Sequence, residues 1–468
     1  MANEKGKEKP GGLTWQCIQA HATRIGDGRR TVREAPRETP VAGEWDVVVA
    51  GGGSAGVGAA LAAAEEGASV LLVERHGMLG GTWTAGLVNP FFEPYKGWIV
   101  DRLIHRLQAG DAWRRKGLHV FDVEQMKYVL ERMVREAGVE FWYHCQVTDP
   151  IVEGNRIVGV IVQGKSGREA VLGKVVIDCS GDGDVAARAG VPFQVGRPDD
   201  GACQPMTLMF EVAGFEGLGD RPAAAVGTHG IMEHLEQAIE EHGLGVELPY
   251  GPQRHGTPAF IALPANSVAV VQATHVYRHD ATNTRELTRA TVEAREQVHE
   301  TFLKALRKVP GLENVRLSQT APQIGVRETR RLEGQYRLEL DDVLAGRRFE
   351  DAVTSASFPL DVHEIAPEDP TPSLPERARS ANVVGYDVPY RCLVPRELDG
   401  LIFAGRCISG SHHAHASYRV TGICMATGQA AGLAAAQSGA RSISPREMDG
   451  KKLHARLAEL GAAFGVQS

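Results

Sequence analysis

The feature that most constrains the fold is a strand, turn, helix and strand pattern in WDVVVAGGGSAGVGAALAAAEEGASVLLVER, residues 45–75. The apolar run at 46–50 predicts a buried strand, the alanine-rich segment at 55–66 predicts a helix, and 69–73 predicts a second strand. A change from strand to helix periodicity across a glycine-rich turn is typical of a βαβ unit. The chain is therefore predicted to be an α/β protein with a parallel sheet.

The turn of this unit carries the pattern Gly51-x-Gly53-x-x-Gly56, which is informative because it lies between a strand and a helix. Gly51 permits the tight turn, Gly53 lets a pyrophosphate approach the backbone, and Gly56 lets helix and strand pack closely. The helix then begins at Ser54 and Ala55, and its N-terminus faces the phosphates. This turn is predicted to bind a dinucleotide.

An acidic residue ends the second strand. Glu74 follows Gly51 by about 20 residues, the spacing at which a carboxylate accepts hydrogen bonds from an adenosine ribose 2′-hydroxyl. The stretch RHGMLGGTWTAGLVNPF at 75–91 is rich in glycine and threonine, whereas an NAD-binding domain has an ordinary crossover there. This composition favours FAD, because the flavin end of that longer cofactor must lie against backbone.

Later segments extend the pattern. The predicted strands are 139–148, 156–163, 171–178, 267–276 and 401–406, and the predicted helices are 121–137, 285–307 and 420–438. The expected domains are an extended or disordered N-terminal arm (1–44), a cofactor-binding domain in two parts (45–195 and 386–440), an inserted substrate domain (196–385) and a C-terminal helix (441–468).

Composition excludes several classes. A net charge of −7 argues against a nucleic-acid partner, which prefers a basic face. No run approaches the roughly 18 apolar residues of a transmembrane helix, so membrane insertion is not expected. Seven cysteines without CxxC spacing predict neither a disulfide framework nor a zinc ribbon, and a reducing cytoplasm is the expected location.

Six stretches carry a resemblance to a known family, and together they run from about residue 45 to 440. They are DVVVAGGGSAGVGAALAAAEEGASVLLVER, LGGTWTAGLV, VVIDCSGDGDVAARAG, IGVRETRRLEG, VPYRCLVP and LIFAGRCISGSHHAHASYRVTGICMATGQAAG. Through them the chain resembles the FAD-dependent oxidoreductase family of the glutathione-reductase-like flavoprotein superfamily, which is related to the fumarate reductase and succinate dehydrogenase flavoproteins.

The resemblance implies a Rossmann-like FAD-binding domain with a βββαβ-type glutathione-reductase-like core, interrupted by an α+β substrate domain. It implies that Val147 contacts the adenine and that Arg406 lies at the ribityl chain, although many relatives carry an acid at the latter position. The expected FAD-binding residues are Gly51, Gly53, Ser54, Ala55, Gly56, Glu74, Arg75, Gly80, Gly81, Thr82, Val147, Gly181, Asp182, Gly405, Arg406, Gly422 and Ile423.

Three histidines, His412, His413 and His415, lie in GRCISGSHHAHASYRVTG at 405–422. Neighbouring histidines diverge on a helix, and no carboxylate or cysteine pair lies near them in the sequence, so no metal site is predicted. The resemblance places His412 and Arg419 at the flavin ring as catalytic residues. His412 would move a proton, and Arg419 would hold a carboxylate or a negatively charged oxygen. The alternative is that both only hold the loop in place.

The stretch GVRETRRLEG at 325–334 gathers three arginines around a glutamate. We interpret it as a structural ion-pair network, with the alternative that Arg327 or Arg330 lies in the substrate cleft. His275 and His363 are interpreted as histidines whose hydrogen bonds are satisfied within the protein.

These patterns predict an FAD enzyme that transfers a hydride between flavin N5 and a small oxygenated substrate, either a hydroxy acid or carboxylate or a sugar-like polyol. Dehydrogenation and reduction are both compatible with the sequence, as is a homo-oligomer. The electron acceptor is not indicated, since a second glycine motif for NAD(P)H is absent from the sequence. The alternatives are a flavin-dependent monooxygenase and a non-catalytic FAD-binding electron-transfer subunit.

Overall fold

A computed structural model describes residues 20–24, 30–34, 36–114, 118–214, 230–250, 258–263, 268–369, 374–379 and 381–465. The chain divides into two compact units, residues 1–40 and 41–468. In the first, β1 (Ala20–Arg24) and β2 (Arg30–Glu34) form an antiparallel hairpin. The segment predicted as an extended arm therefore contains paired strands. Its other residues before 36 lie outside the described part of the chain.

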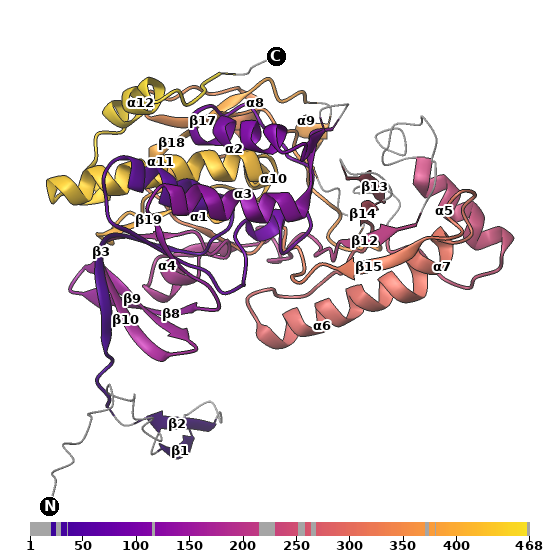
Figure 1. Cartoon of the computed structure of the whole chain (residues 1–468), viewed down its shortest axis with the longest axis horizontal. Helices are drawn as coiled ribbons and strands as arrows, with labels where there is room; N and C mark the ends of the chain where they lie inside the picture. Colours follow the sequence, from indigo (N-terminus) through magenta and orange to yellow (C-terminus); the bar gives the residue numbers. More distant parts are fainter. Residues whose placement is uncertain are drawn as a thin grey trace, which may run out of the picture. The chain divides into compact units, whose positions relative to one another are not determined.

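The main sheet of the second unit has seven described strands (Figure 1). They are β3 (Val41–Ala50), β4 (Val70–Val73), β7 (Glu140–Trp142), β8 (Gln146–Glu153), β9 (Arg156–Gly164), β10 (Gly167–Asp178) and β19 (Leu401–Phe403). The order is β7-β4-β3-β10-β9-β8, and β19 pairs with β10. The neighbouring pairs among β7, β4, β3 and β10 are parallel, and so is the pair of β10 with β19. Strand β9 pairs antiparallel with both β10 and β8.

The first strand is longer than predicted. The expected strand begins at Asp46, but β3 begins at Val41, so the arm also ends earlier than expected. The reason is tertiary pairing, because Val41 to Trp45 lie opposite residues of the long strand β10. These five residues are partly exposed and carry no apolar run that would mark them as a strand in the sequence.

Helix α1 (Ser54–Glu65) packs against α11 (Thr421–Arg441), and both are buried over most of their length (Figure 1). A Cβ atom built on Gly428 would lie 2.0 Å from the carbonyl oxygen of Ala55, and one on Gly432 would lie 2.0 Å from that of Ala59. Only glycine allows this approach of the two backbones. Helices α2 (Trp98–Ala109) and α3 (Val123–Glu136) bury one apolar face each beside α1.

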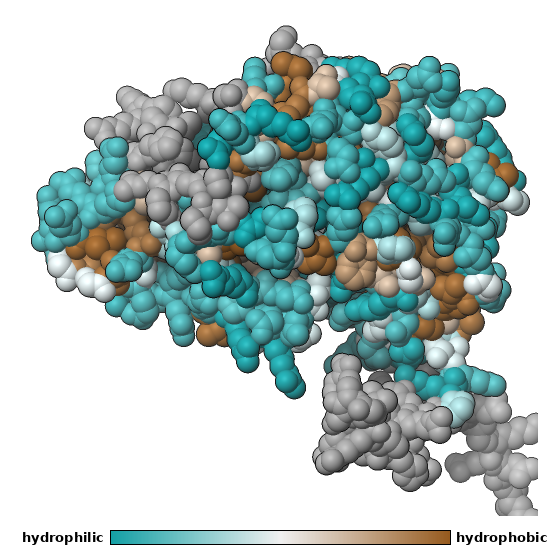
Figure 2. All heavy atoms as spheres, turned by 180° about the vertical axis from the view of Figure 1, so that it is seen from behind, coloured by the Kyte–Doolittle hydropathy of each residue, from teal (hydrophilic) through white to brown (hydrophobic). Residues whose placement is uncertain are grey.

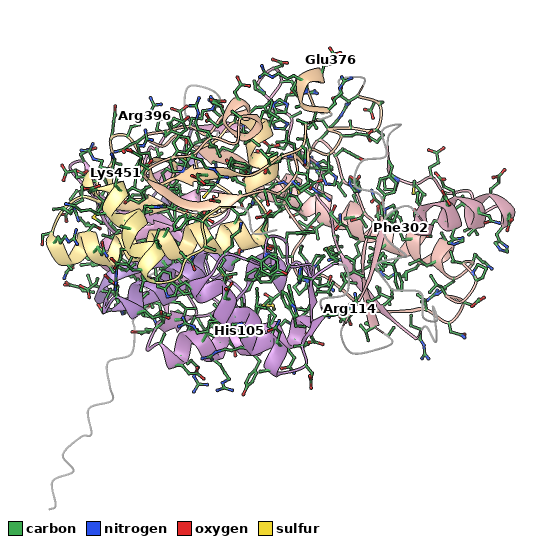
Figure 3. The ribbon with its side chains drawn as sticks, turned by 90° about the horizontal axis from the view of Figure 1, so that it is seen from above. His105, Arg114, Phe302, Glu376, Arg396 and Lys451 are labelled. Carbon is green, nitrogen blue, oxygen red and sulfur yellow. The ribbon has the colours of Figure 1, made fainter. Side chains whose placement is uncertain are left out.

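Residues 196–385 contain a separate four-stranded antiparallel sheet with the order β13-β14-β12-β15. The strands are β12 (Phe210–Ala213), β13 (Ala259–Ala262), β14 (Val268–Gln272) and β15 (Arg316–Thr320). They share a second apolar core with α5 (Gly230–Glu241), a π-helical turn η2 (Gln297–Phe302) and α7 (Leu303–Leu306). Helix α6 (Thr284–Glu296) precedes η2, and its buried Ala290 and Ala294 belong to the first core. Phe302 of the second core is labelled in Figure 3. Its role as a substrate domain stays a prediction.

The C-terminal segment differs from the single helix predicted at 441–468. Helix α12 spans only Gly450–Glu459 and follows a short 3₁₀ turn, η4 (Pro445–Glu447). Asp449 caps α12 by accepting hydrogen bonds from the backbone of Lys451 and Lys452, which fixes where it begins.

The remaining described elements are short. They are η1 (Gly81–Trp83), β5 (Trp113–Arg114), β6 (Val120–Phe121), α4 (Asp184–Arg188), β11 (Phe193–Val195), β16 (Arg330–Leu332), α8 (Leu340–Leu344), β17 (Ala352–Ala356), α9 (Glu376–Arg379), β18 (Tyr386–Pro389), η3 (Tyr390–Cys392) and α10 (His412–Tyr418). The face shown in Figure 2 is mostly hydrophilic, with smaller apolar areas. Within the described ranges, no helix has the length and apolarity needed to cross a membrane.

Candidate cofactor and substrate site

One cavity is lined both by loops of the main sheet and by residues of the 196–385 region. Of the residues predicted to bind cofactor or substrate, those on its lining are Gly51, Gly53, Ser54, Ala55, Glu74, Arg75, Gly81, Thr82, Val147, Gly181, Gly405, Arg406 and Arg419. The others, Gly56, Gly80, Asp182, Gly422, Ile423 and His412, lie outside the lining. The contacts of all these residues with a cofactor stay predictions.

The glycines of the turn before α1 differ in how much space lies beside them. A Cβ atom on Gly51 would lie 2.5 Å from the carbonyl oxygen of Cys179, and one on Gly56 would lie 1.8 Å from that of Gly51. A Cβ atom on Gly53, in contrast, would meet nothing closer than Gly81 Cα at 3.9 Å. The protein itself thus leaves room beside Gly53. That room fits a diphosphate, which the uncapped N-terminus of α1 would also attract.

Glu74 is buried at the end of β4 and holds the turn through both carboxylate oxygens. Oε2 accepts a hydrogen bond from the backbone of Gly52 at 2.7 Å, and Oε1 accepts one from the backbone of His76 at 2.7 Å. Each carboxylate oxygen keeps a second lone pair, so Glu74 can also accept from a ribose hydroxyl on the cavity side.

Arg406, where many relatives carry an acid, has a carboxylate partner behind the lining. Its Nη2 lies 2.7 Å from Asp182 Oδ1, and Thr329 Oγ1 donates to the same oxygen at 2.6 Å. Burial alone would raise the pKa of Asp182, but the charge of Arg406 outweighs it and holds that pKa below its usual range. The pair therefore keeps Arg406 charged and fixed on the cavity wall.

The N-terminus of α11 opens on the cavity through Val420 and Thr421. The hydroxyl of Thr421 is buried and has no hydrogen-bond partner in the structure. Gly422 lies behind it, because a Cβ atom there would lie 2.3 Å from the carbonyl oxygens of Phe92 and Glu93. This unsatisfied hydroxyl and the positive end of a long helix fit the electron-rich edge of a flavin ring.

Arg327, Asp361, His363 and Arg419 meet on the cavity lining, and we call them the charged cluster. Arg419 Nη2 lies 2.7 Å from Asp361 Oδ2, and His363 Nε2 lies 3.4 Å from Asp361 Oδ1. Burial would raise the pKa of Asp361, but the contact with the His363 imidazole and the charges of Arg419 and Arg327 hold it well below its usual range. Asp361 is therefore an anion at neutral pH.

Burial and the charge of Arg327 lower the pKa of His363 to about 4, despite the opposing effect of Asp361. His363 is therefore neutral at pH 7 and can accept a proton. Behind it, His275 is buried, and Gln297 fixes the backbone of His275 by accepting from its N–H at 3.0 Å and donating to its carbonyl at 2.7 Å. Gln297 begins the π-helical turn η2, a type of irregularity frequent at functional sites.

The position of His412 differs from the prediction that it contacts substrate at the flavin. His412 is buried outside the cavity lining, and its Nδ1 lies 2.8 Å from Glu328 Oε1. Glu328 also forms an ion pair with Arg331, and Arg331 donates to the carbonyl of Gly410 at 3.1 Å. This network agrees with the interpretation of 325–334 as structural, although Arg327 lies on the cavity.

The other two histidines of the triplet also lie off the cavity lining. Burial lowers the pKa of His413 to about 4, and it lowers that of His415 well below the usual value. No three His, Cys, Asp or Glu side chains are arranged to hold a metal ion within the part of the chain that the structure describes.

Sequence reasoning missed Asp361, and it interpreted His363 as a satisfied histidine without placing it at a substrate site. Their alternation in DVHE gives one weak signal, because residues i and i+2 of an extended segment lie on the same side. Their approach to Arg327 and Arg419, which come from distant parts of the chain, left no signal in one sequence.

Residues 46–457 match the family model described as FAD dependent oxidoreductase. Over 198 residues the chain is 32% identical to digeranylgeranylglycerophospholipid reductase 1 of Methanopyrus kandleri. The aligned region covers 38% of this chain and 48% of that protein. Over 119 residues it is 34% identical to thiamine thiazole synthase of Aeropyrum pernix, covering 25% of this chain and 43% of that protein. The matches thus span about half of these relatives or less.

Two solved structures match most of the chain at low identity and low TM-score. The flavin-dependent brominase Bmp2 has a TM-score of 0.47 at 15% identity, covering 89% of this chain and 83% of the other. A geranylgeranyl bacteriochlorophyll reductase-like protein of Thermoplasma acidophilum has a TM-score of 0.42 at 14% identity, covering 90% and 84%.

Proposed function

Because the chain belongs to the FAD dependent oxidoreductase family, it is an enzyme whose cofactor is FAD; we propose that it exchanges a hydride with a small oxygen-bearing substrate. The substrate binds where the charged cluster lines the cavity. The observation that carries the proposal is the continuity of this cavity, which extends from the glycine turn at Gly53 to Arg419, Asp361 and His363. Cofactor and substrate thus share one space.

Bound FAD supplies the two-electron acceptor or donor for the hydride. Gly51, Gly53 and the start of α1 would hold its diphosphate, Glu74 its ribose, and Thr421 with the N-terminus of α11 its ring edge. The protein contributes position, charge and a proton acceptor at the other side of the cavity.

Arg419 holds the substrate oxygen that gains negative charge as a hydroxyl becomes a carbonyl, or loses it in the reverse direction. His363 accepts the hydroxyl proton, since its lowered pKa keeps it neutral at pH 7. Asp361 lies beside Nε2 of His363 and stabilises the imidazolium that results. In this proposal Nδ1–H of His363 donates to Nε2 of His275, which fixes the orientation of the ring and leaves Nε2 of His363 free to take the proton.

Apolar side chains exclude water from this part of the cavity. The rings of Phe92 and Phe358 lie edge to face with centroids 5.2 Å apart, and both line the cavity with Met209 and Val326. A dry wall strengthens the interactions of Arg419 and Asp361 with substrate, because water no longer screens them.

We assign His412 a positioning role instead of contact with substrate. His412 bonds Glu328, Glu328 pairs with Arg331, and Arg331 donates to the carbonyl of Gly410. These contacts fix α10, and Arg419 lies at the end of that helix. The names of the reductase relatives support reduction as one direction of the reaction, in which the same residues act in reverse.

Anaerobic absorbance of the flavin band tests the proposal. Oxidised enzyme is mixed with a panel of hydroxy acids and polyols, and dithionite-reduced enzyme is mixed with enoates and keto acids. Bleaching by a panel compound, or reoxidation by one, supports hydride exchange. Bleaching by NAD(P)H alone supports a monooxygenase instead. No change with any compound supports an electron-transfer subunit.

A further inference from the structure

Arg327 is a partly buried cation without a direct counter-ion among the described residues. Its Nη1 donates to the carbonyl of Pro205 at 2.7 Å and to Thr207 Oγ1 at 2.6 Å, and it forms no ion pair within 4.0 Å there. Burial and the charge of Arg419 lower its pKa to about 10, so it remains charged at pH 7. Its hydrogen-bond partners are neutral, and Asp361, whose charge acts on it from a distance, forms its ion pair with Arg419 instead.

The charges of the cluster do not cancel. Arg327 and Arg419 each carry a positive charge, Asp361 carries a negative charge, and His363 is neutral at pH 7. Asp361 is directly paired with Arg419, at 2.7 Å. Nε of Arg419 is buried and has no hydrogen-bond partner. The described lining at this place therefore has one positive charge in excess and a donor that is not satisfied.

This excess charge borders an apolar wall. Phe92, Phe358, Met209 and Val326 line the same cavity as the two arginines. A polyol would contact this wall with its hydroxyl groups and would leave the charge uncompensated. A molecule with one anionic end and an apolar body satisfies both surfaces.

We propose that the substrate is a monocarboxylate whose carboxylate binds Arg327, with Nε of Arg419 as a second donor, and whose apolar body packs against Phe92 and Phe358. The inference rests on the proposed function for the reaction, but the binding needs no turnover. A guanidinium can donate two parallel hydrogen bonds to a carboxylate, and the ion pair neutralises the excess charge of the cluster.

Binding of matched acids and amides tests this. Oxidised holoenzyme with bound FAD is titrated with benzoate and benzamide, and with the smaller pair acetate and acetamide, by flavin difference absorbance and calorimetry. We expect each acid to bind at least about tenfold more tightly than its amide. Arg327→Gln should weaken binding of the acids by roughly 10–100-fold and leave the amides unchanged.

Two variants serve as controls. Arg289→Gln removes an exposed arginine of α6 and should change neither affinity. Arg327→Lys keeps the charge and should bind the acids with intermediate affinity, which remains readable if Arg327→Gln fails to retain FAD.

Equal affinity for acids and amides, or no binding of either acid, would overturn the inference. So would unchanged affinity for the acids in Arg327→Gln or Arg327→Lys with full FAD content. Flavin reduction by polyols without acid binding would retain the proposed function and remove this inference. Acid binding through Arg327 without flavin reduction by any compound would retain the anion site and remove the proposed reaction.

Discussion

His275 Nε2 and His363 Nδ1 lie 3.2 Å apart and share a hydrogen bond in the wall behind the charged cluster. Only one of these two nitrogens carries the hydrogen when both rings are neutral, so the tautomer of one ring fixes that of the other. The side-chain amide of Gln297 accepts from the backbone N–H of His275 and donates to its carbonyl. The orientation of His363 is therefore set from the second core of the protein.

Replacing His363 by asparagine should slow single-turnover flavin reduction by roughly 10²–10⁴-fold at pH 7, because the proton acceptor is lost. In the wild type the neutral ring is the active form and its pKa is about 4, so the rate should stay level from pH 8 to 5 and fall towards pH 4. His363→Asn should lose this acidic fall. His242→Gln, at an exposed histidine, should match the wild type. An unchanged pH profile in His363→Asn would show that another group takes the proton.

Arg419→Lys should slow flavin reduction by about 10²-fold or more, since one ammonium does not replace a planar guanidinium that also bonds Asp361. FAD content should stay near that of the wild type. Stopped-flow absorbance under anaerobic conditions, with the best substrate of the panel, measures this rate separately from reoxidation. Arg289→Lys is the surface control. Wild-type rates in both Arg419→Lys and Arg419→Gln would remove Arg419 from the reaction.

His412→Ala should reduce the free energy of unfolding by about 2–5 kcal/mol, because it leaves the buried carboxylate of Glu328 with fewer partners and opens a void. His412→Gln keeps a donor and should recover much of this loss. Urea unfolding at pH 7 measures both. Flavin reduction should be impaired less than in Arg419→Lys. If His412→Gln is stable yet nearly inactive, His412 acts in the chemistry and not only in positioning.

Gly53→Val should abolish FAD binding while the protein stays folded, because a side chain there enters cavity space and meets no protein atom closely. The measurement is the ratio of flavin absorbance to protein after purification, combined with circular dichroism. Gly439→Ala is the control, since a Cβ atom there makes ordinary contacts with Lys174 at 3.8 Å. A yellow Gly53→Val protein with full FAD content would place the diphosphate elsewhere.

Prolonged chelation should leave turnover unchanged, because the charged cluster offers guanidinium groups where a cation site would need further carboxylates. Elemental analysis of the purified enzyme should find no stoichiometric zinc, iron or copper. Activity that disappears with a tightly bound metal and returns with it would contradict this.

The sequence predicted the local elements that form the proposed cofactor side of the cavity. Gly51, Gly53 and Glu74 lie close together in the chain, and their spacing records one turn between two strands. The longer β3 was not predictable, because residues 41–45 pair with a strand more than a hundred positions away and lack an apolar run.

The substrate side of the cavity was harder to predict for the same reason. The sequence around His412 shows no carboxylate, yet Glu328, more than 80 positions earlier in the chain, lies 2.8 Å from its ring. His363 has partners within the protein, His275 and Asp361, as the sequence interpretation expected, but its approach to Arg327 was not predictable because the two residues are distant in sequence. Charges that meet only through tertiary structure leave no periodic pattern in the chain.

The close approach of α1 and α11 at Gly428 and Gly432 has a consequence for the synthesis of the chain on the ribosome. Helix α1 emerges early and can pack against β3, β4, α2 and α3, whereas its glycine-bearing partner α11 is translated only after residue 420. Until then the face of α1 that meets α11 is uncovered and open to chaperones or to premature collapse. Contacts between such distant segments also slow folding, because a long loop must close first. The cavity wall that includes Gly405, Arg406, Arg419 and Thr421 is thus completed only near the end of translation.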